Sequence, residues 1–158
     1  MAELTHFDDK GAARMVDVTA KPETARTARA SAAVVMHPKT SVTIRDKAVA
    51  KGDVLEVARL AGIMASKKTG ELIPLCHTLP LTSVQIDLVF ENDTTLHIES
   101  RVSTIGRTGV ELEALTAVSV AALTVYDMVK SIDRSVVISN IRLEEKTGGV
   151  RGDYRRSN

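Results

Sequence analysis

The stretch "LTSVQIDLVFENDTTLHIESRVSTI", residues 81–105, alternates apolar and polar side chains on both sides of a polar pair, Asn92 and Asp93. A period of two is typical of strands that bury one face. Asn and Asp favour the turn between two such strands. The stretch therefore predicts a β-hairpin.

Helical patterns flank this hairpin on both sides. "GDVLEVARLAGIMASKKTG", residues 52–70, is amphipathic and reaches a stop signal at Gly70. The side chains expected to form its inward stripe are Val54, Val57, Ala58, Ala61 and Met64. "TGVELEALTAVSVAALTVYDMVKSID", residues 108–133, is apolar nearly all round, which predicts a long helix buried on more than one side.

Strand patterns lie further out along the chain. "TARTARASAAVVM", residues 24–36, has the alanine content of a helix, but its apolar residues recur at period two and it runs into His37-Pro38, which favours a strand. "SVVISNIRLEEKTGG", residues 135–149, predicts a last strand, and "RMVDVT", residues 14–19, a short first one. Residues 38–46 are compatible with a short extra helix.

The main elements follow the order β-α-β-β-α-β, which predicts a ferredoxin-like α+β fold, an antiparallel sheet with helices packed on one face. We expect a flexible N-terminal arm at 1–14, a single ferredoxin-like catalytic domain at 15–153 and a C-terminal tail at 154–158. A small sheet covered on one face should leave its other face apolar. We therefore expect subunits to associate.

Composition narrows the class of protein. With 158 residues, 44% of them hydrophobic, the chain can form one domain with a substantial core. It has no uninterrupted apolar run of about 18 residues, and its start lacks the layout of a signal peptide. A single cysteine excludes an internal disulfide and fits a reducing cytoplasm. The net charge of +1 and the scarcity of aromatic residues argue against nucleic-acid binding.

The proline-bounded loop "LIPLCHTLPL", residues 72–81, contains adjacent Cys76 and His77. Neither has a third or fourth metal ligand at a suitable spacing, so a metal site is not predicted. Cys76 fits a small buried side chain better than a nucleophile, because a base adjacent in sequence usually points away. His77 suits either a cleft or a structural role, and both interpretations stay open.

The long helix carries charged residues near both of its ends. Asp127 and Lys130 are neighbours on a helix, and they fit either a helix-end ion pair or a general acid–base unit. Asp127 follows the apolar run "AALTVY", and we expect it to be partly desolvated. Glu113 lies fourteen positions before Asp127, about 21 Å away along a helix. One small substrate cannot easily reach both groups. Either the substrate is long, like a nucleoside triphosphate, or the site combines residues of two subunits.

Four segments together resemble the cyclic pyranopterin monophosphate synthase family, accessory protein C of molybdenum cofactor biosynthesis. They are "MVDVTAK", "KGDVLEVARLAGIMASKKTGELIPLCHTLPL", "TGVELEALTAVSVAALTVYDMVKSID" and "RLEEKTGG". The combination of LIPLCH, GVE-x-EAL and YDM-x-K is specific, and the likeness covers roughly residues 3 to 153.

The resemblance implies a reaction and an assembly. The substrate would be 3′,8-cyclo-7,8-dihydroguanosine triphosphate, supplied by a radical enzyme acting on GTP, and the products cyclic pyranopterin monophosphate and pyrophosphate. The chain would be a phosphorus–oxygen lyase of the cytoplasm. It would form a homohexamer, a trimer of dimers with sites at the dimer interface. No redox cofactor or built-in metal is expected, although Mg²⁺ can accompany the triphosphate.

The resemblance also implies roles for individual residues. Asp127 and Lys51 would be catalytic and would move protons. The substrate-binding residues would be Lys21, Arg26, Leu75, Cys76, His77, Glu111, Leu112, Glu113, Lys130 and Lys146. Lys130, Lys146 and His77 would neutralise phosphate charge. Two positions depart from the family pattern, with Thr78 in place of proline and Leu112 in place of methionine. We expect neither departure to abolish activity, although Thr78 could relax the loop that positions His77.

Overall fold

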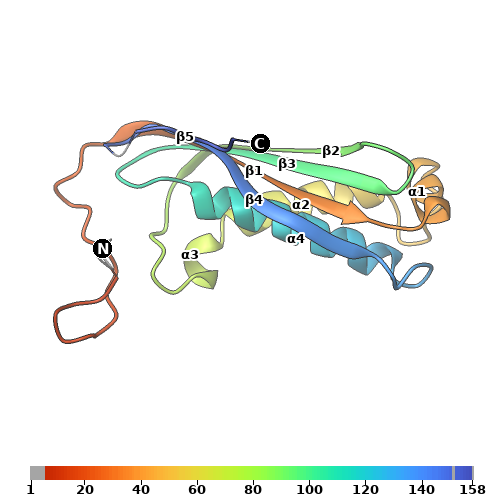
Figure 1. Ribbon diagram of the computed structural model, residues 1–158, viewed down its shortest axis with the longest axis horizontal. Helices are drawn as coiled ribbons and strands as arrows, with labels where there is room; N and C mark the ends of the chain where they lie inside the picture. Colours follow the sequence, from red (N-terminus) through yellow and green to blue (C-terminus); the bar gives the residue numbers. More distant parts are fainter. Residues whose placement is uncertain (1–5, 151, 158) are drawn as a thin grey trace.

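A computed structural model describes residues 6–150 and 152–157 and shows one antiparallel sheet with helices against one of its faces (Figure 1). The strands are β1 (Thr24–Val35), β2 (Leu81–Phe90), β3 (Thr95–Gly106), β4 (Val137–Thr147) and β5 (Tyr154–Arg155). The helices are α1 (Pro38–Arg45), α2 (Val54–Ser66), α3 (Thr69–Leu72) and α4 (Glu111–Val129).

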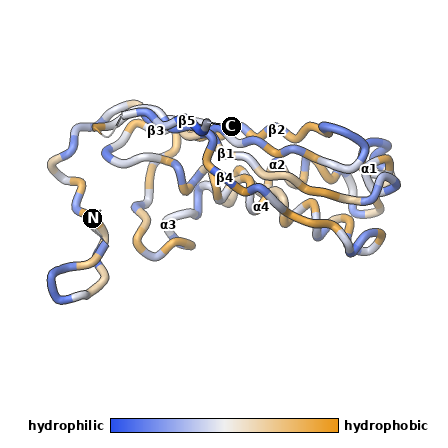
Figure 2. Tube along the Cα trace, viewed as in Figure 1, coloured by the Kyte–Doolittle hydropathy of each residue, from blue (hydrophilic) through white to orange (hydrophobic). Residues whose placement is uncertain are grey.

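The sheet has the strand order β2-β3-β1-β4-β5, and each neighbouring pair is antiparallel. Its first four strands confirm the ferredoxin-like prediction, including the β2–β3 hairpin, whose hydrophilic turn is visible in Figure 2. The prediction of a short strand at residues 14–19 is wrong. That segment is irregular and pairs with no strand, and Arg107 Nη1 donates to the Thr19 carbonyl oxygen at 3.0 Å. The short strand β5 was not expected.

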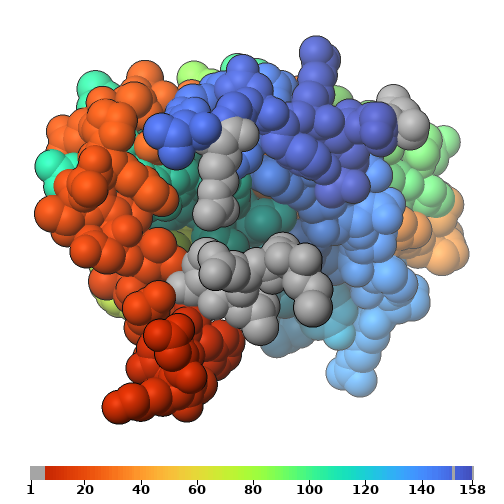
Figure 3. Space-filling model, turned by 60° about the vertical axis from the view of Figure 1, so that its left-hand side comes forward, coloured from red at the N-terminus to blue at the C-terminus, as the bar shows by residue number. Residues whose placement is uncertain are grey.

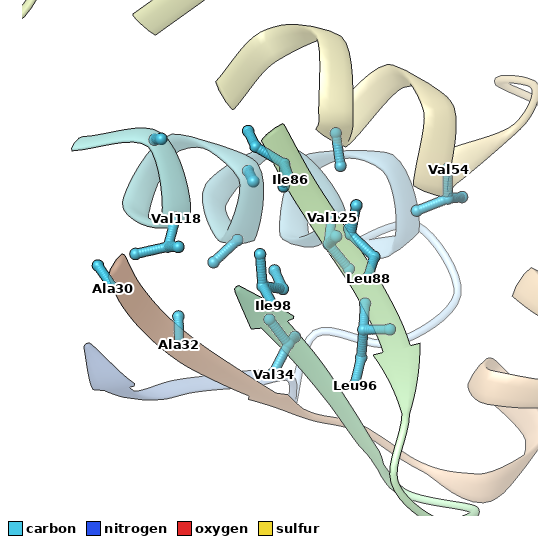
Figure 4. Packing of buried hydrophobic residues seen from close by; sticks show 14 of the residues in the cluster. Ala30, Ala32, Val34, Val54, Ile86, Leu88, Leu96, Ile98, Val118 and Val125 are labelled. Atoms are coloured by element: carbon cyan, nitrogen blue, oxygen red, sulfur yellow. The ribbon is translucent and has the colours of Figure 1, made fainter. Parts of the chain in front are cut away.

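Small side chains bring α4 close to the sheet. Ala30, Ala32 and Val34 of β1 point toward the helices and pack with Ile98 of β3 and Val118 of α4 (Figure 4). The close packing of α2 on α4 depends on a glycine in the same way. A Cβ atom at Gly62 would lie 2.7 Å from the carbonyl oxygen of Ala117. α4 is long and apolar enough to cross a membrane, but it packs here as a core helix against β1, β3 and β4.

The inward stripe of α2 differs from the prediction. Its buried residues are Val54, Ala58, Gly62 and Ser66, spaced four apart. Val57 and Met64 are exposed instead, because the small residues of the stripe are the ones that fit beneath α4. The helix also ends at Ser66, and Gly70 lies inside α3 rather than acting as the stop signal.

The open face of the sheet is polar, so the expectation of an apolar face is wrong. Arg29 of β1 lies 3.2 Å from the Glu99 carboxylate and 3.7 Å from that of Glu145. Beside it, the hydroxyl groups of Thr27 and Ser103 are 3.0 Å apart. Charged and hydroxyl groups on three adjacent strands therefore meet at the centre of this face. Exposed apolar side chains lie on the helices, as Val57, Leu60, Met64 and Leu123, and toward the ends of the strands, as Val35, Val89, Ile105 and Val137.

Both edges of the sheet carry features that interrupt regular pairing. On the β2 edge, Arg59 Nη1 donates to the carbonyl oxygen of Ile86. On the other side, β4 shifts register twice against β1 and contains Asn140 with a positive φ of 53°. Such irregularities are how natural sheets avoid adding foreign strands.

Candidate active site

A cavity of about 320 Å³ opens where β1 begins, β3 and β4 end, and α4 starts. In Figure 3 the N-terminal segment and the C-terminal strands stand on two sides of the teal start of α4. The walls come from residues 16–21, the start of β1, the 75–77 loop, the 107–112 connection and the end of β4. Five segments that are distant in sequence therefore meet in one recess.

Arg26 is fixed in one orientation in the wall of this cavity. Its side chain is buried, Nε donates to the carbonyl oxygen of Gly106 at 2.9 Å, and Nη2 donates to that of Arg107 at 3.2 Å. Gly148 and Gly149 pass against it with positive φ angles of 86° and 90°. A Cβ at Gly149 would collide with the guanidinium, so the glycine leaves room for it.

The lining is predominantly basic. Lys21, His77, Arg107 and Lys146 join Arg26 around the recess. The acidic member is Glu111, whose carboxylate lies 3.4 Å from Lys146 Nζ. A fixed guanidinium among lysines is the arrangement that binds phosphate oxygens most strongly. The cavity can therefore hold a polyanion.

A buried carboxyl group lies behind the loop wall. Glu113 is 2% exposed, and its Oε2 atom has no hydrogen-bond partner among the described residues. Burial raises the pKa of Glu113 from 4.5 to about 6. The Cys76 thiol lies 3.9 Å from Glu113 Oε1, and burial together with this carboxyl raises the pKa of Cys76 as well. Both shifts are toward the neutral forms, and a raised pKa does not suit Cys76 to nucleophilic chemistry.

A second cluster lies at the other end of α4. The Asp127 carboxylate lies 2.6 Å from Lys130 Nζ and 3.1 Å from Lys51 Nζ. These two ammonium groups lower the pKa of Asp127, with Lys130 the larger influence. The Asp127 side chain is 57% exposed, so the expectation that it is partly desolvated is wrong for the single chain. No residue of this cluster lines the cavity at the start of α4.

Comparison with known proteins covers nearly the whole chain. The MoaC family pattern matches residues 15–149. The chain belongs to the MoaC family. A cyclic pyranopterin monophosphate synthase of Thermomicrobium roseum is 61% identical over 157 residues, which are 99% of this chain and 95% of that protein. The synthase of Heliobacterium modesticaldum is 60% identical over 157 residues, 99% of each chain, and that of Brevibacillus brevis 54% over 154 residues, 98% and 96%.

The structure separates the site residues that the MoaC resemblance implied into three groups. The cavity brings together Lys21, Arg26, Leu75, Cys76, His77, Glu111, Leu112 and Lys146. Glu113 lies behind the wall without lining it. Lys51, Asp127 and Lys130 stay together at the far end of α4. Within one chain, the two implied catalytic residues therefore lie away from most of the implied substrate-binding residues.

The sequence reasoning missed several residues of the wall. Arg107 is the most important of them, because it adds a further guanidinium group to the wall. His6, Val16 and Val18 also line the cavity, and they come from a part of the chain that was expected to be an arm or a strand. Arg107 lies two residues before the GVE-x-EAL motif, but nothing in its local sequence marks it as part of the cavity wall.

Thr78, which departs from the MoaC pattern, lies against α3. A Cβ atom at Gly70 would come within 2.7 Å of Thr78 Oγ1. Gly70 has no side chain and so leaves space for Thr78, the residue that directly follows the 75–77 loop. Within residues 6–150 and 152–157, no three His, Cys, Asp or Glu side chains form a cluster that could hold a metal ion.

Proposed function

We propose that this chain is a cyclic pyranopterin monophosphate synthase that acts in molybdenum cofactor biosynthesis. The observation that carries the proposal is the identity of 61% and 60% to proteins of that name over 95% and 99% of their lengths. The basic cavity at the start of α4 supports it, since the proposed substrate, 3′,8-cyclo-7,8-dihydroguanosine triphosphate, is a polyanion.

The cavity residues would bind the triphosphate. Arg26 supplies a fixed guanidinium, and Lys21, Lys146 and His77 add positive charge or hydrogen bonds. In the proposed reaction a hydroxyl oxygen of the substrate attacks the first phosphorus, and the bond from that phosphorus to pyrophosphate breaks. The bound cations stabilise the negative charge that develops on the leaving pyrophosphate. This places the chain among phosphorus–oxygen lyases, with Mg²⁺ as a companion of the substrate triphosphate.

Asp127 and Lys51 would move protons while the purine-derived ring opens and the pterin closes. Their cluster is open to water in the single chain, and a carboxylate with a lowered pKa is a weak base there. Acid–base groups work better in a site that excludes water. We therefore propose that a second copy of the chain covers this cluster, and that each complete site takes Lys51, Asp127 and Lys130 from one copy and the cavity from another.

The proposal also covers the oligomeric state of the chain, its cellular compartment and the source of its substrate. The chain would form a homohexamer, a trimer of dimers with sites at the dimer interfaces. It would act in the cytoplasm, downstream of a radical enzyme that supplies its substrate from GTP. No redox cofactor enters the proposed chemistry, because ring opening, ring closure and phosphate cyclisation leave the oxidation level of the substrate unchanged.

Supplying the cyclised triphosphate to the purified protein and measuring pyrophosphate tests the activity. Stoichiometric pyrophosphate and cyclic pyranopterin monophosphate are expected, and wild-type protein that forms neither would refute the proposal. Mixing two inactive variants tests whether each site takes residues from two copies of the chain. Lys51→Ala and His77→Ala chains are each inactive alone, but mixed assemblies should recover about a quarter of wild-type activity, because half of the dimers are mixed and each has one intact site. No recovery would place all of these residues in one chain's site.

A further inference from the structure

The segment that leads into β1, residues 15–23, lies along one side of the cavity without belonging to the sheet (Figure 3). We call it the N-terminal strap. Its half-buried members between positions 16 and 21 are Val16, Val18 and Lys21, and all three line the cavity. The residues between them are exposed. The alternation that suggested a strand therefore turns these three side chains toward the recess, and no neighbouring strand is involved.

Arg107 attaches the strap to the rest of the fold. Its Nη1 atom donates to the carbonyl oxygen of Thr19 at 3.0 Å, and its Nε atom lies 3.7 Å from the carboxylate of Glu23. The other hydrogen bonds of the strap are local turns within it. Among residues 6–150 and 152–157, no further hydrogen bond or ion pair joins the strap to another part of the chain. The strap therefore depends on Arg107 for its polar attachment.

The backbone of Arg107 is itself held by the buried guanidinium of Arg26. Arg26 donates to the carbonyl oxygen of Gly106 at 2.9 Å and to that of Arg107 at 3.2 Å. Arg107 thus accepts a hydrogen bond from one cation of the cavity and holds, with its side chain, the segment that carries another. Because Lys21 belongs to the strap and Arg26 to β1, Arg107 sets the position of one cation relative to the other.

Fixing the strap in advance would strengthen the binding of an anion. A segment without ladder hydrogen bonds opens easily. A lysine on such a segment binds phosphate weakly, because the segment and its long side chain lose conformational freedom when they are ordered. Two nitrogen atoms of the Arg107 guanidinium already face the strap, so this group is used to order the segment before the ligand arrives.

We propose that Arg107 is a positioning residue, which holds the N-terminal strap against the cavity so that the Lys21 ammonium group faces the bound triphosphate. The inference rests on the proposed function for the identity of this ligand. Arg107 acts through Lys21 and not through a phosphate contact of its own. Loss of Arg107 should therefore weaken substrate binding more than it slows turnover, because Lys21 takes no part in the proposed proton transfers.

A double-mutant cycle separates positioning from direct binding. Calorimetry would measure the dissociation constant of inorganic tripolyphosphate for wild type, Arg107→Gln, Lys21→Ala and the double variant. Each single variant should bind about tenfold more weakly. The double variant should be weakened by no more than about twentyfold, because Lys21 contributes little once Arg107 is gone. Independent losses that multiply to about a hundredfold, or wild-type protein that does not bind tripolyphosphate, would overturn the proposal.

Hydrogen exchange shows whether the strap itself loosens. In Arg107→Gln the amides of Thr19 and Lys21, which are hydrogen-bonded inside the strap, should exchange at least about fivefold faster, while those of β1 and β3 keep their rates. Arg14→Gln is the matched control, because it removes the same charge from an exposed residue just before the strap. It should change neither the exchange nor the affinity. Unchanged exchange of the strap in Arg107→Gln would contradict the positioning role.

Turnover distinguishes this inference from the proposed function. Arg107→Gln should raise KM for the cyclised triphosphate about tenfold and lower kcat by less than about threefold. Wild-type protein that forms no pyrophosphate, but shows the coupled losses of tripolyphosphate binding, would refute the function and leave the positioning role standing. Pyrophosphate release by wild type together with independent losses in the cycle would refute the positioning role alone.

Discussion

The ammonium group of Lys51 donates to two oxygen atoms of Asp127, the carbonyl oxygen at 2.7 Å and the carboxylate at 3.1 Å. The two residues are far apart in sequence, and both contacts hold Lys51 at the end of α4. Exposed ion pairs of this kind contribute little to stability, because water and salt screen them. Because the Lys51–Asp127 contact stabilises the fold so little, we interpret it as positioning the two groups for the proposed proton transfer.

We expect Asp127→Asn and Lys51→Ala to lose at least 100-fold in pyrophosphate release while the melting temperature stays nearly unchanged. The proton-transfer groups are removed, but no buried contact is lost. Lys47→Ala is the control, since Lys47 and Asp53 form another exposed pair at 2.8 Å near the start of α2. Full turnover in either site variant would remove that residue from the mechanism.

Glu113 should make stability fall as pH rises. Its pKa is raised from 4.5 to about 6 by burial, so the folded state keeps its proton over a range in which the unfolded chain has already lost it. The stability present below pH 4.5 is therefore lost as pH rises through 6, by about 2 kcal/mol.

Glu113→Gln should remove this dependence because the amide does not ionise. Urea denaturation of both proteins at pH 4.5 and pH 8 would measure it. The variant should gain about 2 kcal/mol over wild type between the two pH values. Parallel pH profiles for the two proteins would mean that folding does not raise the pKa of Glu113.

Asp133 should act in the opposite direction. It accepts hydrogen bonds from Ser135, from the His37 amide and from the Thr40 hydroxyl, and these, Ser135 first, lower its pKa to about 2. Its stabilising effect is present above the unfolded pKa near 3.8 and is lost as pH falls toward 2. Asp133→Ala should cost about 1–3 kcal/mol at pH 7 by leaving donors unpaired. An unfolding midpoint equal to that of wild type would contradict this.

Gly62→Ala provides a test in which two effects have opposite signs. Helix propensity alone predicts a gain of about 1 kcal/mol. The added Cβ would lie 2.5 Å from Ile86 Cδ1 and 2.7 Å from the Ala117 carbonyl oxygen. Forcing α2 away from α4 should therefore destabilise the variant by about 1–3 kcal/mol, measured by urea denaturation. A more stable variant would show that the two helices separate without cost.

The fold was largely predictable because periodicity is a local property. The alternation in residues 81–105 was enough to identify the hairpin, and the ambiguous alanine-rich segment was correctly taken as a strand. The predictions that failed concern which residues of a helix face a neighbouring element, and this depends on tertiary packing. Val57 and Met64 have the same helical spacing as the buried stripe, and only the close approach of α4 at Gly62 shows that small residues face inward.

The candidate site was predictable to a similar degree. Motif resemblance identified residues that the fold gathers in one cavity, such as Arg26 and His77, without showing their arrangement. The role of Arg107 could not be read from its neighbours, because its position in the wall depends on the end of β3 meeting β1. The exposure of Asp127 was misjudged, since the buried residues of the run before it are Ala121, Ala122 and Val125, which face the core, while Asp127 points away from it.

The irregular edges of the sheet affect how a newly synthesised chain can associate with other copies. Arg59 occupies a carbonyl group on the β2 edge, and register shifts with the left-handed Asn140 disturb β4. Such edges disfavour the addition of a strand from another copy of the chain. They would therefore keep edge-to-edge polymerisation from competing with the proposed assembly while the protein is being synthesised.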